Sequence, residues 1–328
     1  MVEKVIGAVD IGGTKIHVGI VDDLGNVLAD QCFPTDADHQ SGEEAMDKVA
    51  DILSDLCSQA GMQLKNLRGI GVSCAGPVNI ETGIVENPYT LAGWMGFPIV
   101  KDLSRKTGLE VRLENDANGA LLGEIFQRNR KEQRVLMITL GTGIGVAFWQ
   151  EGELYRGGKY HPEMGHIIVA SDGPECYCGH RGCFESLCSG KAINERAQLA
   201  GYRDFDEVYE KACGQEKPAS ELLERILKDM KNGIWSLNIV FKPDTIILAG
   251  GFSKKYFSLI RDAVMEDCCG KEDFLNPFEM LPACGNKNSA LVGANMLFYK
   301  DEAVSNSLPC DFAARAKNYR SLERKEAL

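Results

Sequence analysis

Residues 161–190 read HPEMGHIIVASDGPECYCGHRGCFESLCSG and combine histidines and cysteines with a glycine-rich loop. Thiolates and one imidazole held by such a loop are typical ligands of tetrahedral zinc. We expect a structural site whose four protein ligands leave no open coordination position: His166, Cys176, Cys178 and Cys183. The spacing alone also fits a redox pair or buried core cysteines. It does not exclude His161 or His180 as the imidazole ligand.

Two acidic residues bracket this predicted metal loop. Glu163 lies three residues before His166, and Glu185 lies two residues after Cys183. A metal that folds the loop back on itself would bring these two carboxylates together from distant points of the sequence. Carboxylates accept hydrogen bonds from neutral hydroxyl groups with charge-assisted strength.

Length, charge and composition exclude several classes of protein. The 328 residues suggest about two domains. A net charge of −11 argues against a nucleic-acid-binding face, which would be basic. We find no signal-peptide pattern at the N-terminus and no run of about 18 apolar residues that predicts a membrane span. We interpret the twelve cysteines as reduced thiols, three of them metal ligands, which predicts a cytoplasmic protein.

Two glycine-rich turns each join a pair of apolar strands. DIGGTK spans residues 10–15 between strands predicted over 4–10 and 16–21, and GTGIG spans 141–145 between strands over 134–140 and 146–149. Glycine amides can approach phosphate, a threonine hydroxyl adds a donor, and a carboxylate can hold hydrated Mg²⁺. The first turn alone fits a plain surface hairpin equally well. The repeated plan hints at two duplicated halves. The second turn is not a Rossmann turn, because no helix follows it, and the chain has no Walker A loop.

Small or polar residues follow three other predicted strands, at the end where ligands commonly bind in α/β sheets. The strand over 109–113 runs into Asn115 and Asp116, and Asp116 is either a helix cap or a catalytic base. Gly76 lies in the small-residue stretch that follows the strand over 67–72. Gly250 and Gly251 follow the strand over 245–249 and either simply begin a helix or lie against a nucleotide. The loop over residues 87–94 is either the rim of a sugar site or a surface turn.

The order of these motifs resembles that of the ROK family, the bacterial glucokinase-type sugar kinases and their related repressors. The most specific part is E-x-G-H followed by C-x-C-G-x-x-G-C-x-E, and the similarity extends from about residue 5 to residue 300. The resemblance implies an α/β protein with the actin-like ATPase fold of hexokinase and Hsp70, in which two α/β domains surround a central cleft. We expect an N-terminal domain over 1–118, joined by a returning helix over 290–303, a larger domain over 119–289 that contains the zinc loop, and a tail over 304–328.

The resemblance also implies a role for each matching residue. Asp116 would be the general base that takes the proton from the primary hydroxyl of a sugar. The sugar-binding residues would be Gly76, Asn115, Asp116, Glu163, His166 and Glu185. The residues for ATP and Mg²⁺ would be Asp10, Gly12, Gly13, Thr14, Lys15, Gly141, Thr142, Gly250 and Gly251. His166 could hold zinc through one ring nitrogen and offer the other to the sugar.

The expected function is therefore ATP-dependent phosphorylation of a hexose, with structural zinc, by a homodimer or homotetramer that binds neither nucleic acid nor membrane. Glucose is our first choice, because C-x-C-G-H-R-G-C looks like the family's glucokinases. H-P-E-M-G-H resembles its fructokinases instead, so fructose, mannose and N-acetylhexosamines stay open, as does polyphosphate as the donor. Val146 and Ala147 stand where many members continue with glycine. A repressor would need a helix-turn-helix of about 70 residues before the first turn, for which we expect no room, and a zinc-ribbon interaction module would leave Glu163 and Glu185 without a role.

Overall fold

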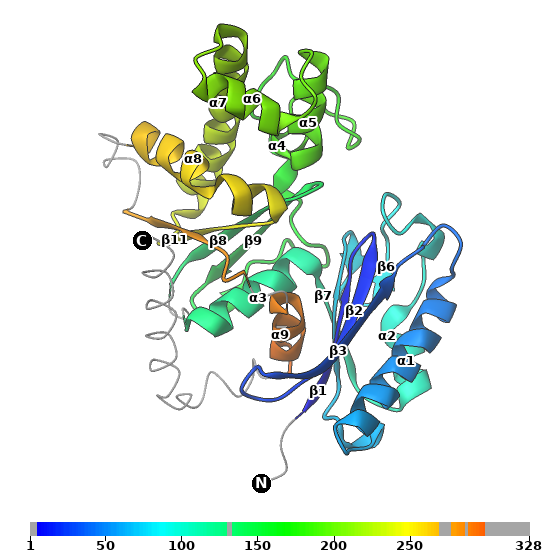
Figure 1. Cartoon of the computed structure of the whole chain (residues 1–328). Helices are drawn as coiled ribbons and strands as arrows, with labels where there is room; N and C mark the ends of the chain where they lie inside the picture. Colours follow the sequence, from blue (N-terminus) through cyan, green and yellow to red (C-terminus); the bar gives the residue numbers. More distant parts are fainter. Residues whose placement is uncertain (1–4, 130–132, 269–276, 286–287, 299–328) are drawn as a thin grey trace.

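The computed structural model describes residues 5–129, 133–268, 277–285 and 288–298, and two mixed five-stranded sheets form its framework (Figure 1). The first sheet has the order β3-β2-β1-β4-β7. Its antiparallel part consists of β1 (Ile6–Ile11), β2 (Lys15–Val21) and β3 (Val27–Pro34), and β4 (Ile70–Cys74) and β7 (Val111–Asn115) continue it parallel to β1. The carboxyl ends of β1, β4 and β7 therefore lie at the same edge.

The second sheet repeats this plan, with the order β10-β9-β8-β11-β12. Here β8 (Val135–Leu140), β9 (Ile144–Gln150) and β10 (Glu153–Leu154) are antiparallel, and β11 (Thr245–Ala249) and β12 (Glu279–Pro282) run parallel to β8. The duplication predicted from two similar glycine turns is thus present in the strand order. In each sheet the glycine-rich turn joins the central strand to its antiparallel neighbour, β1 to β2 in the first sheet and β8 to β9 in the second.

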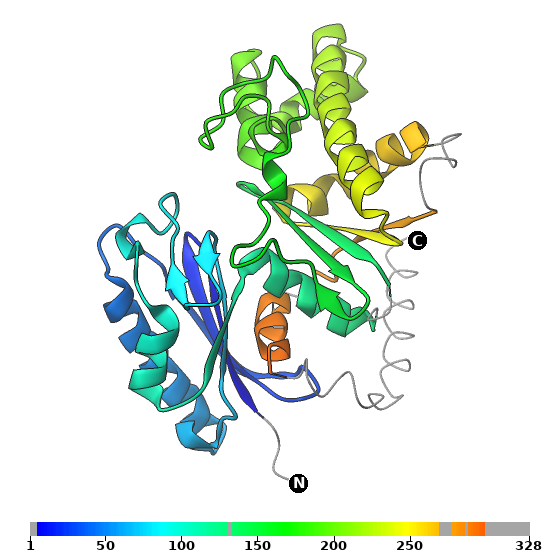
Figure 2. The ribbon, with the colours of Figure 1, turned by 180° about the vertical axis from the view of Figure 1, so that it is seen from behind.

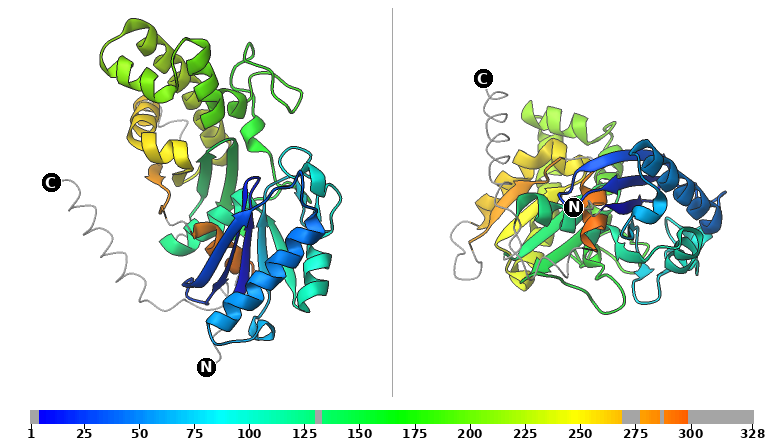
Figure 3. Two further views of the ribbon diagram at one scale, coloured as in Figure 1. Left: turned by 45° about the vertical axis from the view of Figure 1, so that its right-hand side comes forward. Right: turned by 90° about the horizontal axis from the view of Figure 1, so that it is seen from below.

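Helices cover the outer face of each sheet (Figures 2 and 3). On the first sheet these are α1 (Gly42–Gln59) and α2 (Ile99–Thr107). The start of α1 is stabilised by a capping box, in which Ser41 and Glu44 satisfy each other's backbone N–H groups. The second sheet carries α4 (Phe184–Cys188), α5 (Gly190–Leu199), α6 (Phe205–Cys213), α7 (Lys217–Phe241) and α8 (Gly251–Cys268). The remaining short elements are β5 (Val78–Asn79), β6 (Ile84–Val85) and the 3₁₀ turns η1 (Leu64–Asn66), η2 (Ala92–Trp94) and η3 (Met164–His166).

Two helices, α3 (Asp116–Arg128) and α9 (Ser289–Met296), lie between the sheets (Figure 1). They approach each other closely because glycines face each other where they cross. A β-carbon at Gly293 would meet the Gly119 carbonyl oxygen at 1.7 Å, and one at Gly71 on β4 would meet the Ala294 carbonyl oxygen at 1.9 Å. The α9 helix packs against β1 and β4 of the first sheet. Residues 299–303 of the helix predicted over 290–303 and the predicted tail over 304–328 lie outside the described residues.

The strands predicted over 4–10, 16–21, 67–72, 109–113, 134–140, 146–149 and 245–249 correspond to β1, β2, β4, β7, β8, β9 and β11, with boundaries that differ by at most three residues. The sequence patterns did not predict α2, β10 or β12. No described helix has both the length and the apolar character that crossing a membrane requires.

Candidate active site

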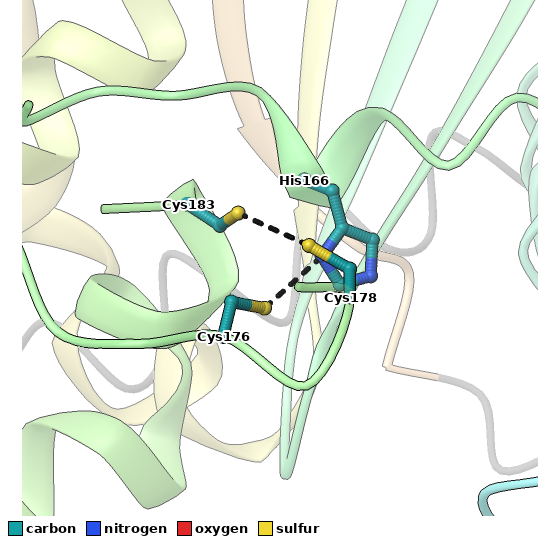
Figure 4. A group of neighbouring side chains, drawn as sticks. All are labelled: His166, Cys176, Cys178 and Cys183. Atoms are coloured by element: carbon teal, nitrogen blue, oxygen red, sulfur yellow. Dashed lines mark hydrogen bonds between the residues drawn. The ribbon is translucent and has the colours of Figure 1, made fainter. Parts of the chain in front are cut away.

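The predicted zinc ligands lie together. The ligand atoms of His166, Cys176, Cys178 and Cys183 are all within 4.8 Å of one another, and their side chains point toward a common centre (Figure 4). Cys176 Sγ lies 3.4 Å from His166 Nδ1, and Cys178 Sγ lies 3.5 Å from Cys183 Sγ. Sulfur atoms on the corners of a zinc tetrahedron are about 3.8 Å apart for a Zn–S bond of about 2.3 Å. The four residues therefore fit zinc in both chemistry and spacing.

The structure also separates His166 from its rival histidines. His161 is buried, and its Nε2 lies 2.8 Å from the Val146 carbonyl oxygen, which holds the ring away from the thiols. Burial lowers the pKa of His161 to about 4, so its ring is neutral. His180 is exposed and contributes its backbone carbonyl to the loop, as acceptor of the Cys176 N–H at 2.8 Å. His166 alone among the three belongs to the cluster.

Asn115, not Asp116, is the N-cap residue of α3. The Asn115 Oδ1 accepts hydrogen bonds from the backbone N–H groups of Ala117 at 2.9 Å and Asn118 at 3.3 Å. The other half of the amide, Nδ2, is directed at Gly76, where a β-carbon would meet it at 2.7 Å. The same β-carbon would lie 3.5 Å from Glu163 Oε1. The absence of a side chain at Gly76 thus leaves room beside Asn115 and Glu163.

Four carboxylates near Gly76 and the glycine-rich turns influence one another electrostatically: Asp10, Asp116, Glu163 and Glu185. Burial raises the pKa of Asp116 to about 6. Burial and the charge of Asp116 raise the pKa of Asp10 to about 7, against a smaller opposing effect of Lys15. Partial burial of the carboxylate, followed by the charges of Asp116 and Glu185, raises the pKa of Glu163 to about 7, although the residue as a whole is exposed to solvent. The order of neighbours is therefore Asp10, Asp116, Glu163 and Glu185.

Glu185 connects the metal loop to the second glycine turn. Its Oε2 accepts a hydrogen bond of 2.7 Å from the Ile144 N–H, and a β-carbon at Gly143 would meet the same oxygen at 2.6 Å. Glycine at position 143 thus allows the carboxylate to reach the turn. Because Cys183 is the N-cap residue of α4 and Glu185 lies in the first turn of that helix, the metal cluster and this carboxylate share one short backbone segment.

The glycine turns lie on either side of Asp116. Asp10 is the half-buried penultimate residue of β1 and lies near Asp116, and Ala117 packs against Gly145 of the second hairpin, whose β-carbon would lie 3.3 Å from that of Ala117. The first turn is held by hydrogen bonds from Gly12 N–H to the Lys15 carbonyl at 3.0 Å and from Thr35 Oγ1 to the Gly12 carbonyl at 2.7 Å.

Gly250 and Gly251 adjoin the second turn. Gly250 has φ of +93°, and its β-carbon would meet the Leu140 carbonyl oxygen at 2.3 Å, immediately before Gly141. Gly251 begins α8, as predicted, and faces open space, as does Gly141. Thr142 lies between Gly141 and Gly143 in the turn. A ligand can therefore approach the Cα atoms of Gly141 and Gly251 closely, while the Gly141 N–H donates a hydrogen bond to the Gly143 carbonyl at 3.0 Å within the turn.

Sequence reasoning missed three residues of this region. Glu114 is buried and pairs with Arg156, which comes from the loop after β10, and it accepts a further hydrogen bond of 2.9 Å from Asn118 Nδ2. Tyr177 places its hydroxyl 3.1 Å from His166 Nε2. Glu114, Arg156 and Tyr177 belong to no motif with a characteristic spacing, so only the structure identifies them as part of this region.

Comparison with known proteins places this site in a family. The ROK family model matches residues 6–301. A glucokinase from Thermotoga maritima is 28% identical over 313 residues, which cover 89% of this chain and 96% of that protein. An N-acetylmannosamine kinase from Vibrio cholerae is 27% identical over 296 residues, which cover 89% of this chain and 98% of that protein.

Solved structures agree in fold. The ROK hexokinase from Thermus thermophilus superposes with a TM-score of 0.77 at 28% identity, covering 90% of this chain and 99% of its own. A ROK family glucokinase from Streptomyces griseus, solved with glucose and AMPPNP, has a TM-score of 0.67 at 26% identity and covers 90% of this chain and 98% of its own. The two α/β sheets are thus those of the actin-like ATPase fold. By sequence and by fold, the chain belongs to the ROK family, among its sugar kinases.

Proposed function

We propose that this sugar kinase transfers a phosphoryl group from ATP to the primary 6-hydroxyl of a hexose, with glucose as the preferred acceptor and Asp116 as the general base. The observation that carries the proposal is the space that Gly76 leaves beside Asn115 and Glu163, where a β-carbon would lie 2.7 Å from Asn115 Nδ2 and 3.5 Å from Glu163 Oε1. The carboxylates of Asp10, Asp116, Glu163 and Glu185 interact around this space, which lies between the first glycine turn and the metal loop. A neutral sugar presents several hydroxyl groups in a row, and such a line of acceptors is suited to them.

In the proposed reaction, Asp116 accepts the proton of the 6-hydroxyl. The hydroxyl oxygen then forms a bond to the γ-phosphorus, the bond from that phosphorus to the β–γ bridging oxygen breaks, and ADP leaves. A pKa of about 6 keeps Asp116 ionised at neutral pH while leaving it basic enough to share a proton, which suits a general base. Its place between the two glycine turns supports this role.

Backbone amides of the two turns would bind the phosphates, because glycines allow them to approach closely. Asp10 is the residue that would hold Mg²⁺, which when bound neutralises charge on the phosphates. Zinc would be structural: His166, Cys176, Cys178 and Cys183 would hold it and so fix the direction of Glu185 from the adjoining helix.

The relatives support a sugar substrate and leave its identity to experiment. The Streptomyces griseus glucokinase is described in complex with glucose and AMPPNP, which supports an ATP-binding site on this fold. The glucokinase and the N-acetylmannosamine kinase relatives are nearly equally similar to this chain. N-acetylmannosamine is therefore the second candidate, ahead of fructose and free mannose.

A coupled assay of ADP formation across a panel of hexoses tests the proposal. The panel contains glucose, mannose, fructose, N-acetylglucosamine and N-acetylmannosamine, each with ATP and with polyphosphate as the donor. We expect the largest kcat/KM with glucose and ATP, and ³¹P NMR of the product should place the phosphate on O6. Absence of sugar-dependent ADP release with every hexose would reject catalysis and favour a sugar-sensing protein.

A further inference from the structure

Two tyrosines from opposite parts of the chain meet beside the proposed sugar site. Tyr89 belongs to the loop that follows β6, and Tyr177 lies between two of the zinc ligands. Their ring centroids are 4.5 Å apart at an interplanar angle of 54°, although 54% of Tyr89 and 57% of Tyr177 are exposed. The ring contact thus joins the loop after β6 to the metal loop, although both rings are largely exposed.

The base of the Tyr89 loop is rigid. Asn87 is fully buried, and its Nδ2 donates hydrogen bonds to the Ala75 carbonyl at 3.2 Å and to Thr90 Oγ1 at 2.7 Å. Its Oδ1 accepts a hydrogen bond of 2.9 Å from the Tyr89 N–H. These hydrogen bonds fix the backbone from which the Tyr89 side chain extends to Tyr177.

Tyr177 contacts groups that the proposed function gives to the sugar. The His166 ring stands perpendicular to the Tyr177 ring at a centroid distance of 5.0 Å, and its Nε2 lies 3.1 Å from the Tyr177 hydroxyl oxygen. With Nδ1 directed at the thiols, Nε2 carries the proton and donates it to this oxygen. The Glu185 carboxylate is a further near neighbour of the Tyr177 hydroxyl. The phenol thus occupies one end of the carboxylate line.

Asp116 lies toward the other end of that line, next to the terminal carboxylate of Asp10. In a hexopyranose the ring carbon C2 lies across the ring from C5, which carries the primary hydroxyl group. A sugar whose 6-hydroxyl contacts Asp116 consequently directs C2 toward Glu185 and Tyr177. Any bulky group on C2 then meets the paired tyrosine rings.

We propose that Tyr177, braced by Tyr89, is a specificity-determining residue that limits the space at C2 of the sugar and so favours hexoses with a free 2-hydroxyl over N-acetylhexosamines. This inference rests on the proposed function, because it uses Asp116 to orient the sugar. A 2-hydroxyl group can take the place of the phenol oxygen between His166 Nε2 and Glu185, whereas an N-acetyl group needs the volume of the ring itself.

The test compares kcat/KM and calorimetric Kd for glucose, N-acetylglucosamine and N-acetylmannosamine in the wild type and four variants. In Tyr177→Ala the ratio of kcat/KM for the N-acetylhexosamines to that for glucose should rise by about tenfold or more, as expected when steric exclusion is removed. Tyr89→Ala should change the ratio in the same direction and by less. Tyr177→Phe keeps the ring and should leave the ratio within about twofold of the wild type.

Ile168→Ala is the matched control, since Ile168 is an exposed apolar residue of the same loop (56% exposed). It should not move the ratio, and zinc content should stay the same in all variants. An unchanged ratio in Tyr177→Ala, by both turnover and binding, overturns the inference, and so does a wild type that already prefers N-acetylhexosamines. Failure of the proposed function is distinguished by wild-type protein that binds or turns over no hexose at all.

Discussion

Asp116 owes its raised pKa to burial, and the charges near it make its titration a shared event. Asp116 has a pKa of about 6, and its neighbours Asp10 and Glu163 have pKa values of about 7 that its charge helps to raise. A general base acts when deprotonated, so kcat/KM for the hexose should fall as the pH drops through this range, with apparent pKa values of the coupled group between about 6 and 7. A pH–rate profile that stays flat down to pH 5 would contradict this assignment.

The same burial makes ionised Asp116 costly for folding. Its pKa is about 6 in the folded protein, against 3.8 for a solvated aspartate, so the folded protein binds the proton more tightly than the unfolded chain. The resulting loss of stability is absent below pH 3.8, grows as the pH rises and is complete above about pH 6. Asp116→Asn should therefore be more stable than the wild type at pH 8, by about 1–3 kcal/mol, and the difference should disappear near pH 4.

Urea denaturation of both proteins at pH 8 and about pH 4 measures this difference. Asp51→Asn, an exposed carboxylate on the outer side of α1, serves as the control and should show no such pH-dependent gain. Equal stability of Asp116→Asn and wild type at pH 8 would mean that the carboxylate is solvated in the folded protein.

The metal loop is the element that brings Glu185 to the second glycine turn. Cys178→Ser replaces a soft thiolate by a poor zinc ligand, so we expect loss of zinc and a fall in hexose phosphorylation of about tenfold or more. Metal analysis of the purified protein and the coupled assay measure both effects. Cys213→Ser, an exposed cysteine in α6, is the matched control and should keep its zinc and its activity. Full activity in zinc-free Cys178→Ser protein would contradict the prediction that the zinc-bound loop positions Glu185 for phosphorylation.

The junction of β7 and α3 depends on a buried ion pair. The Glu114 side chain is 2% exposed and pairs with Arg156, whose side chain is 30% exposed. Arg156→Leu leaves the Glu114 carboxylate buried without its cation, and the free energy of unfolding should fall by about 2–4 kcal/mol. Arg181→Leu removes an exposed pair with Glu175 and should cost less than about 1 kcal/mol. Equal costs for the two variants, measured by urea denaturation, would show that the Glu114 pair is not buried in solution.

At the level of elements, sequence patterns predicted most of the fold. Apolar strands joined by glycine-rich turns are local signals, and local signals can be interpreted from one chain. The role of Asp116 could not be predicted from the sequence pattern alone, because both Asn115 and Asp116 are good helix-capping residues. In the structure Asn115 is the N-cap residue of α3, so the Asp116 carboxylate does not cap the helix and is available for chemistry.

Over the whole molecule, the two halves share one strand order and enclose α3 and α9 between them. The resemblance predicted this architecture, but contacts between distant segments carry no sequence signal. The pairing of Tyr89 with Tyr177 and of Glu114 with Arg156 joins residues that are far apart in the chain. Such pairs depend on how the two sheets are placed relative to each other, and they required the structure.

The central claim is that Asp116, between two glycine turns, takes the proton of a hexose bound along the carboxylate line. The most direct test measures ATP-dependent formation of hexose 6-phosphate and glucose binding on the same samples of wild type and Asp116→Asn. We predict that kcat falls by about a thousandfold, while the calorimetric Kd for glucose changes by less than about fivefold. A variant that phosphorylates glucose at a rate near that of the wild type would contradict the claim.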